Sequence, residues 1–125
     1  VGSAPPERAG SAAAISETSL EFGGAVGIAI LGSIVTAVYR SQMALTQPSG
    51  MAPDAARSAA ATLGGAVAEA ARLPPDLASS LLAAARMAFV AGMQLSALVA
   101  MVGLVVTAMT ALVLLRNATA ASHHG

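Results

Sequence analysis

The sequence contains no cysteine, no lysine and no tryptophan, and it has few aromatic or charged residues. Without cysteine the chain forms no disulfide and offers no thiolate to a metal ion or a substrate. Charged residues make up only 10% of the chain, whereas a soluble domain normally has about a quarter. Six arginines are balanced by six acidic residues. The chain therefore has no basic stripe, and binding to nucleic acid is not expected.

Two long uncharged runs indicate membrane helices. The first has 18 residues and ends before Arg40, and the helical pattern extends it backwards, so a transmembrane helix is predicted at 11–39. The second has 29 residues between Arg86 and Arg116, and a transmembrane helix is predicted at 87–115. A soluble core helix of this length and uniformity would be exceptional. The fold class predicted from the sequence is therefore an all-α membrane protein with two transmembrane helices.

The polar segment 40–86 between the two runs is predicted to be a helical-hairpin loop outside the lipid. A proline followed by an aspartate begins an alanine-rich helix near 53–72, and the same pair begins a second helix near 76–86. Gly64 and Gly65 weaken the first of these helices by about 1 kcal/mol each relative to alanine.

Charge alone does not decide on which side of the membrane this loop lies. The loop 40–86 carries four arginines, whereas the flanking segments 1–10 and 116–125 carry one each. A simple count of positive charge places the loop in the cytoplasm. Two helices of a larger protein need not obey that rule by themselves, so the sequence leaves the orientation open.

Glu17 and Glu21 are the residues of the first predicted helix that are most able to carry chemistry. They are four residues apart and therefore share one face of the helix. A carboxylate at the centre of a bilayer helix costs about 2.5–3.5 kcal/mol, so such groups usually face a protein interior or a wet cavity, where they bind protons or cations. Both glutamates lie toward the polar end of the helix, however. A place at the membrane interface is an equally good interpretation of the pattern.

Four glycines make the same helix unusually smooth: Gly23, Gly24, Gly27 and Gly32. Small residues four apart allow helix backbones to approach each other closely in a membrane. We expect these glycines to pack against other helices. The sequence shows no phosphate-binding loop, no nucleophile elbow and no metal-ligand spacing, so neither an enzyme nor a bound metal is predicted.

The stretch 5–33, PPERAGSAAAISETSLEFGGAVGIAILGS, resembles the penultimate helix of 14-helix drug:proton antiporters of the major facilitator superfamily. This group includes quaternary-ammonium and methyl viologen resistance exporters. The long helical loop, the last apolar helix and the short tail are similar too. The resemblance implies that the two spans are helices 13 and 14 of a parent transporter. It also implies that 40–86 is extracellular or periplasmic and that 1–10 and 116–125 are cytoplasmic.

The resemblance further implies a role for Glu17 and Glu21 in the drug cavity, either in proton coupling or in cation recognition. The family's signatures on earlier helices are absent from this sequence, so the chain is interpreted as a C-terminal fragment. Its expected partners are the remaining transmembrane helices, the lipid bilayer and cationic lipophilic drugs. A proton gradient would be its energy source, no cofactor is expected, and the location would be the bacterial inner membrane.

The leading prediction is thus a fragment of a proton-coupled multidrug efflux transporter that exports hydrophobic or quaternary-ammonium cations. The alternative is a small two-span membrane protein that acts as an oligomerising or accessory subunit. In that alternative the glycine faces would bind copies of the same chain.

Overall fold

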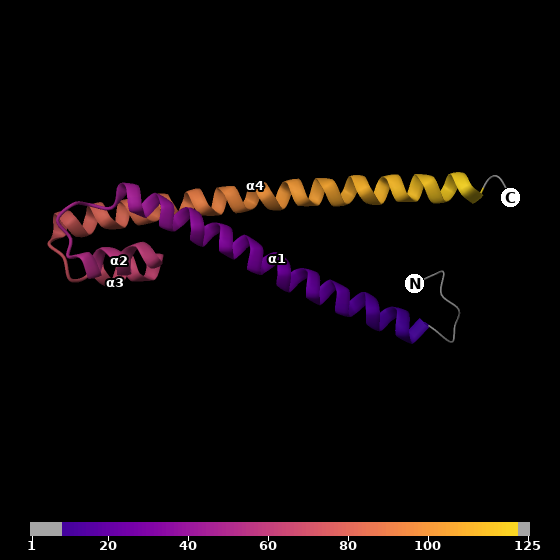
Figure 1. Cartoon of the computed structure of the whole chain (residues 1–125), viewed down its shortest axis with the longest axis horizontal. Helices are drawn as coiled ribbons and strands as arrows, with labels where there is room; N and C mark the ends of the chain where they lie inside the picture. Colours follow the sequence, from indigo (N-terminus) through magenta and orange to yellow (C-terminus); the bar gives the residue numbers. More distant parts are fainter. Residues whose placement is uncertain (1–8, 123–125) are drawn as a thin grey trace. The chain divides into compact units, whose positions relative to one another are not determined.

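The computed structural model describes residues 9–122, in which there are four helices and no strand (Figure 1). The helices are α1 (Ala9–Thr46), α2 (Pro53–Ala61), α3 (Leu63–Ala70) and α4 (Pro75–Ser122). Two segments are long and apolar enough to cross a membrane, Ala13–Thr46 in α1 and Pro75–Ala118 in α4. The prediction of an all-α membrane protein is confirmed. Most of the predicted segment 1–10 and the last three residues of the predicted tail lie outside the described residues.

The chain divides into two compact units, one ending at Ser33 and the other beginning at Ile34. The described part of the first unit is the N-terminal part of α1. The second unit holds the rest of α1 together with α2, α3 and α4. With 48 residues, α4 is about 72 Å long at 1.5 Å per residue. A helix of this length exceeds the hydrocarbon core of a bilayer, which is about 30 Å thick.

Hydroxyl groups on the exposed apolar helices find hydrogen-bond acceptors inside their own helix. Thr18 of α1 donates to the carbonyl of Ala14 at 2.9 Å, and Thr107 of α4 donates to that of Gly103 at 2.8 Å. Each of these bonds reaches back four residues, the common arrangement for hydroxyls within a helix. Because no outside partner is needed, these side chains add little cost to placing the helices in lipid.

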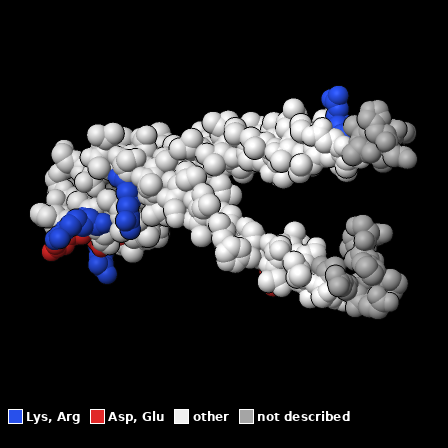
Figure 2. Space-filling view, turned by 45° about the vertical axis from the view of Figure 1, so that its right-hand side comes forward, with Lys and Arg blue, Asp and Glu red and all other residues white. Residues whose placement is uncertain are grey.

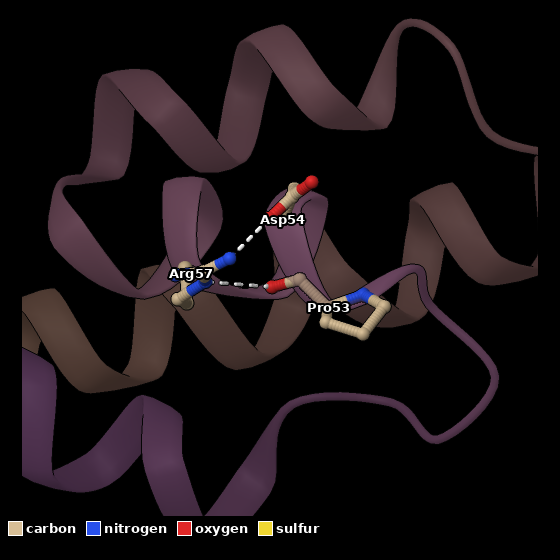
Figure 3. A network of polar contacts seen from close by, with 3 residues as sticks. All are labelled: Pro53, Asp54 and Arg57. Atoms are coloured by element: carbon tan, nitrogen blue, oxygen red, sulfur yellow. Dashed lines mark hydrogen bonds and ion pairs between the residues drawn. The ribbon is translucent and has the colours of Figure 1, made fainter.

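The turn between α1 and α2 is built from proline and glycine. Pro48 follows the end of α1 because it has no N–H to continue the helix, and Gly50 has a φ of 98°, which glycine adopts without strain. Pro53 occupies the first turn of α2. Arg57 pairs with Asp54 and also donates from Nε to the carbonyl of Pro53 at 3.4 Å (Figure 3). Since both charged side chains are largely exposed, this ion pair contributes little stability.

The segment near 53–72, for which the sequence predicts one helix, contains two helices that meet at Thr62. The backbone of Thr62 is extended, with φ −152° and ψ 157°, and this ends α2. Its Oγ1 accepts a hydrogen bond from the N–H of Gly65 at 3.0 Å, so Thr62 is the N-cap of α3. The break lies two residues before the pair of glycines that the sequence gives as the weak point. The predicted segments 76–86 and 87–115 are continuous parts of α4.

Small side chains form the core of the second unit. Its buried apolar residues are contributed by all four helices and are mostly alanine, and they are Tyr39, Met43, Ala59, Ala66, Ala70, Leu81, Ala84, Ala85 and Ala88. Alanine keeps the distance between neighbouring helices short, and two glycines make the contacts tighter still. A Cβ added to Gly65 would collide with the carbonyl oxygen of Ser58, and one added to Gly92 would lie 3.0 Å from that of Val35.

Candidate functional site

The first unit presents Glu17 and Glu21 on one side of α1. Both side chains are exposed, and neither takes part in a hydrogen bond or an ion pair with another described residue. Four helical residues turn by about 400°, so the two side chains leave the axis within about 40° of each other. Their Cβ atoms are then about 5–6 Å apart. The helix geometry thus places the two predicted site residues together.

The only charged side chains between residues 9 and 33 are the two negatively charged glutamates themselves. The first unit has no basic residue between 9 and 33, so neither carboxylate has a counter-ion in the described part of that unit. Like charges one helical turn apart disfavour each other by about 0.2–0.5 kcal/mol on an exposed helix. A proton or a monovalent cation bound between the two carboxylates relieves this repulsion. Among the described residues there is no group of three or more side chains able to hold a metal ion.

The glycines next to these glutamates have open space beside them. A Cβ added to Gly23, Gly24, Gly27 or Gly32 would meet no atom within 4 Å. The described residues of the first unit therefore supply no partner for the close packing that the sequence predicts at Gly23, Gly24 and Gly27. Helix packing at this face stays a prediction and requires a surface from outside the first unit.

A close helix contact that the sequence analysis missed lies in the second unit, at Gly92 of α4. Gly92 lies against the backbone of Val35 of α1. The signal was present in the sequence, because Ala88, Gly92 and Ser96 are small residues four apart, the spacing that favours close helix packing. All three are buried.

The hairpin of α2 and α3 is fixed to α1 by the only tyrosine of the chain. The hydroxyl of Tyr39 donates a hydrogen bond to the carbonyl of Ala59, in α2, at 2.8 Å, and the bond is buried. A buried carbonyl without a partner would cost about 1–3 kcal/mol. This bond therefore favours one position of α2 on α1, and no local pattern in the sequence indicates it, because its two residues are 20 positions apart.

Charged side chains of the second unit gather at the end that carries α2 and α3, whereas most of the length of α4 shows none (Figure 2). The acidic and basic residues of this end belong to the segment 40–86. Beyond it, α4 exposes large apolar side chains such as Leu104 at 72% and Leu115 at 66%. In water such a surface would be strongly unfavourable. It fits contact with lipid or with further apolar helices.

Comparison with known proteins shows that the chain is homologous to efflux pumps. It is 45% identical over 100 residues to the multidrug efflux pump LfrA of Mycolicibacterium smegmatis, a match that covers 80% of this chain and 19% of the relative. It is 34% identical over 90 residues to the methyl viologen resistance protein SmvA of Salmonella typhimurium, covering 72% of this chain and 18% of that protein.

The chain thus spans about a fifth of the length of these relatives. No family model matches the chain, and no solved structure matches it significantly. The resemblance to drug exporters that the stretch 5–33 carries is confirmed by these relatives.

Proposed function

We propose that this homologue of multidrug efflux pumps is part of a proton-coupled exporter of hydrophobic or quaternary-ammonium cations, and that it transports rather than catalyses. The observation that carries the proposal is the 45% identity to a multidrug efflux pump over 100 residues. The second relative, a methyl viologen resistance protein, supports a cationic substrate, because methyl viologen carries quaternary nitrogen.

In this proposal α1 and α4 are the last two helices of a 14-helix major facilitator bundle in the bacterial inner membrane. The segment 40–86 is external, and 1–10 and 116–125 are cytoplasmic. The open space beside the glycines of α1 and the exposed apolar side chains of α4 support contact with the remaining helices and with lipid. The energy source is the proton gradient, and no cofactor is required.

Glu17 and Glu21 are the proposed coupling residues. When a cavity closes around a carboxylate and removes water, the neutral form of the group becomes more stable relative to the charged form. A nearby organic cation has the opposite effect and favours the ionised carboxylate. A proton and a lipophilic cation therefore compete for the same pair of groups. This competition is the physical basis for exchanging an entering proton for a leaving drug.

The test is to replace Glu17 and Glu21 by glutamine, singly and together, in the full-length protein and to measure ethidium efflux under a proton gradient. Glutamine keeps the size of the side chain but cannot release a proton. We expect at least one variant to lose efflux tenfold or more. Glu69→Gln is the matched control, because Glu69 lies on α3 and pairs weakly with Arg72 at 3.9 Å. It should stay within twofold of the unmodified protein.

Unchanged efflux in the double variant would show that the two glutamates have no role in coupling and only lie at the membrane interface. The oligomerising two-span protein is the second candidate, because the open space beside Gly23, Gly24 and Gly27 suits copies of the same chain as well. The reading frame that encodes the chain separates the two proposals. An exporter requires twelve further apolar spans, whereas an accessory subunit requires none.

A further inference from the structure

A cavity of about 180 Å³ lies in the second unit where α1, α4 and the junction of α2 and α3 meet. Its position along the chain is distinctive, because the two longest side chains in its wall are next to the ends of the uncharged runs. Tyr39 directly precedes Arg40, and Phe89 follows Arg86 by three residues. The cavity is therefore at the boundary between the apolar part of the helices and the charged loop. The lining residues are Val35, Thr36, Tyr39, Ala61, Thr62, Leu63 and Phe89.

The wall of this cavity selects an uncharged, apolar occupant. None of its lining side chains is charged at neutral pH. The hydroxyl proton of Tyr39 is donated to the carbonyl of Ala59, and Oγ1 of Thr62 accepts from the N–H of Gly65. A buried water needs two to four polar partners. Only three of the seven lining residues carry a hydroxyl group, Thr36, Tyr39 and Thr62, and the other four have purely apolar side chains. Apolar atoms are favoured in such a space.

The volume limits the occupant to a single ring. An apolar cavity of about 150 Å³ holds one benzene molecule, whereas a site for a whole drug-sized molecule has about 300–1,000 Å³. The cavity of about 180 Å³ therefore accommodates one ring of a drug and not the complete molecule. Phe89 is 36% exposed, so the face or edge of its ring is accessible to a second ring, with which aromatic contacts are favourable.

The walls of the cavity are held in place before any ligand binds. The bond from Tyr39 to Ala59 joins α1 to α2, and the N-cap at Thr62 fixes the junction of α2 and α3. The contact of Gly92 with Val35 sets the distance between α4 and α1 beside the cavity. A preformed site loses less conformational entropy on binding than a flexible one.

We propose that this cavity is a subsite for one uncharged aromatic ring of an exported compound, with the charged part of the compound remaining outside. The inference rests on the proposed function, because export is what brings a lipophilic cation to the external end of α1 and α4. It adds a binding site in the second unit that is separate from Glu17 and Glu21. It assigns recognition of an apolar ring to Leu63 and Phe89.

The experiment uses the full-length protein that contains this chain, in proteoliposomes, and an uncharged phenyl diazirine as a photoactivated probe. Labelled residues are identified by mass spectrometry, with and without an excess of the unreactive parent compound. We expect label at Leu63 or Phe89 to fall at least fivefold with the competitor. Label at Leu112, which is exposed on α4 and does not line the cavity, should not change, because non-specific labelling does not saturate. Label at the cavity that does not respond to the competitor would overturn the proposal.

Ala61→Leu is the variant that fills the cavity, since Ala61 lines it without contributing a side-chain hydrogen bond. It should abolish the saturable label, and Leu63→Phe, which adds volume from α3, should do the same. Ala68→Leu makes the same change at an exposed position of α3 and should label as the unmodified protein does. If the protein with Ala61→Leu showed as much saturable label as the unmodified protein, the probe would bind outside the cavity and the proposal would be wrong.

Ethidium, which carries a neutral phenyl ring, provides the second competitor. It should reduce the cavity label at least fivefold, and failure to do so would refute an exported compound as the occupant. Efflux from cells is measured separately. Absent efflux together with saturable labelling would reject the proposed function but not the cavity as a ring site, so the two failures are distinguishable.

Discussion

At the scale of single residues, Gly92 and Gly103 are two glycines of α4 with opposite surroundings. A Cβ on Gly92 would lie 3.0 Å from the carbonyl oxygen and 3.1 Å from the Cα of Val35, whereas a Cβ on Gly103 would meet nothing within 4 Å. Backbone atoms cannot move aside as the end of a flexible side chain can. Gly92 is therefore required for the approach of α1 to α4, and Gly103 is not required for any contact among the described residues.

We predict that Gly92→Leu lowers the free energy of unfolding of the 125-residue chain in detergent by about 1–3 kcal/mol, the usual cost of overpacking. Gly103→Leu is the control and should be neutral or slightly stabilising, because leucine is the better helix former. Unfolding is followed by circular dichroism as denaturant is added. Equal stability of the two variants would mean that α1 and α4 do not meet at Gly92.

Glu17 and Glu21 show which properties of a residue follow from local sequence and which do not. The spacing of Glu17 and Glu21 predicts that they share a helix face, because helix geometry is local. Whether they lie in a wet cavity is not a local property. It depends on what surrounds the first unit, and the role of the two glutamates as coupling residues stays a prediction.

At the scale of elements, the hairpin of α2 and α3 depends on one of two adjacent glycines. A Cβ on Gly65 would collide with the backbone of Ser58 in α2, whereas a Cβ on Gly64 would have Thr62 Oγ1 as its nearest neighbour, at 3.9 Å. From the sequence, both glycines are predicted to be weak points of one helix. In the structure Gly65 is a packing contact, and Thr62 is the residue that separates the helices.

We predict opposite effects for alanine at these two positions. Gly65→Ala should destabilise the packing of α2 on α3 by about 1–3 kcal/mol through the forced contact. Gly64→Ala should be neutral or stabilising by up to about 1 kcal/mol, since alanine is the better helix former. Hydrogen–deuterium exchange of the amides of α2 and α3 measures the effect of each substitution on the stability of these helices. Faster exchange in the protein with Gly64→Ala than in that with Gly65→Ala would reverse the assignment.

At the scale of the whole molecule, the open question is on which side of the membrane the segment 40–86 lies. Counting arginines places it in the cytoplasm, whereas the similarity to drug exporters implies the outside. The absence of cysteine makes the question accessible, because a single introduced thiol is the only one in the chain.

We predict that Ser58→Cys, in α2, reacts with a membrane-impermeant maleimide in intact spheroplasts, with any other cysteines of the full-length protein replaced. Ala118→Cys, near the end of α4, should react only after the membrane is permeabilised. Leu104→Cys is the control and should stay unreactive in both conditions, because lipid covers the thiol. Reaction of Ala118→Cys but not of Ser58→Cys in intact spheroplasts would place the loop in the cytoplasm.

The sequence by itself determined the fold class, the two apolar helices and the family to which the chain is similar. These follow from properties read along the chain: uncharged runs, helix-starting prolines and the stretch 5–33. Only the tertiary structure decided that Tyr39 of α1 holds α2 and that Gly92 of α4 lies against the backbone of Val35. Such contacts join residues 20 or more positions apart, and local patterns do not specify which distant backbone a small residue will meet.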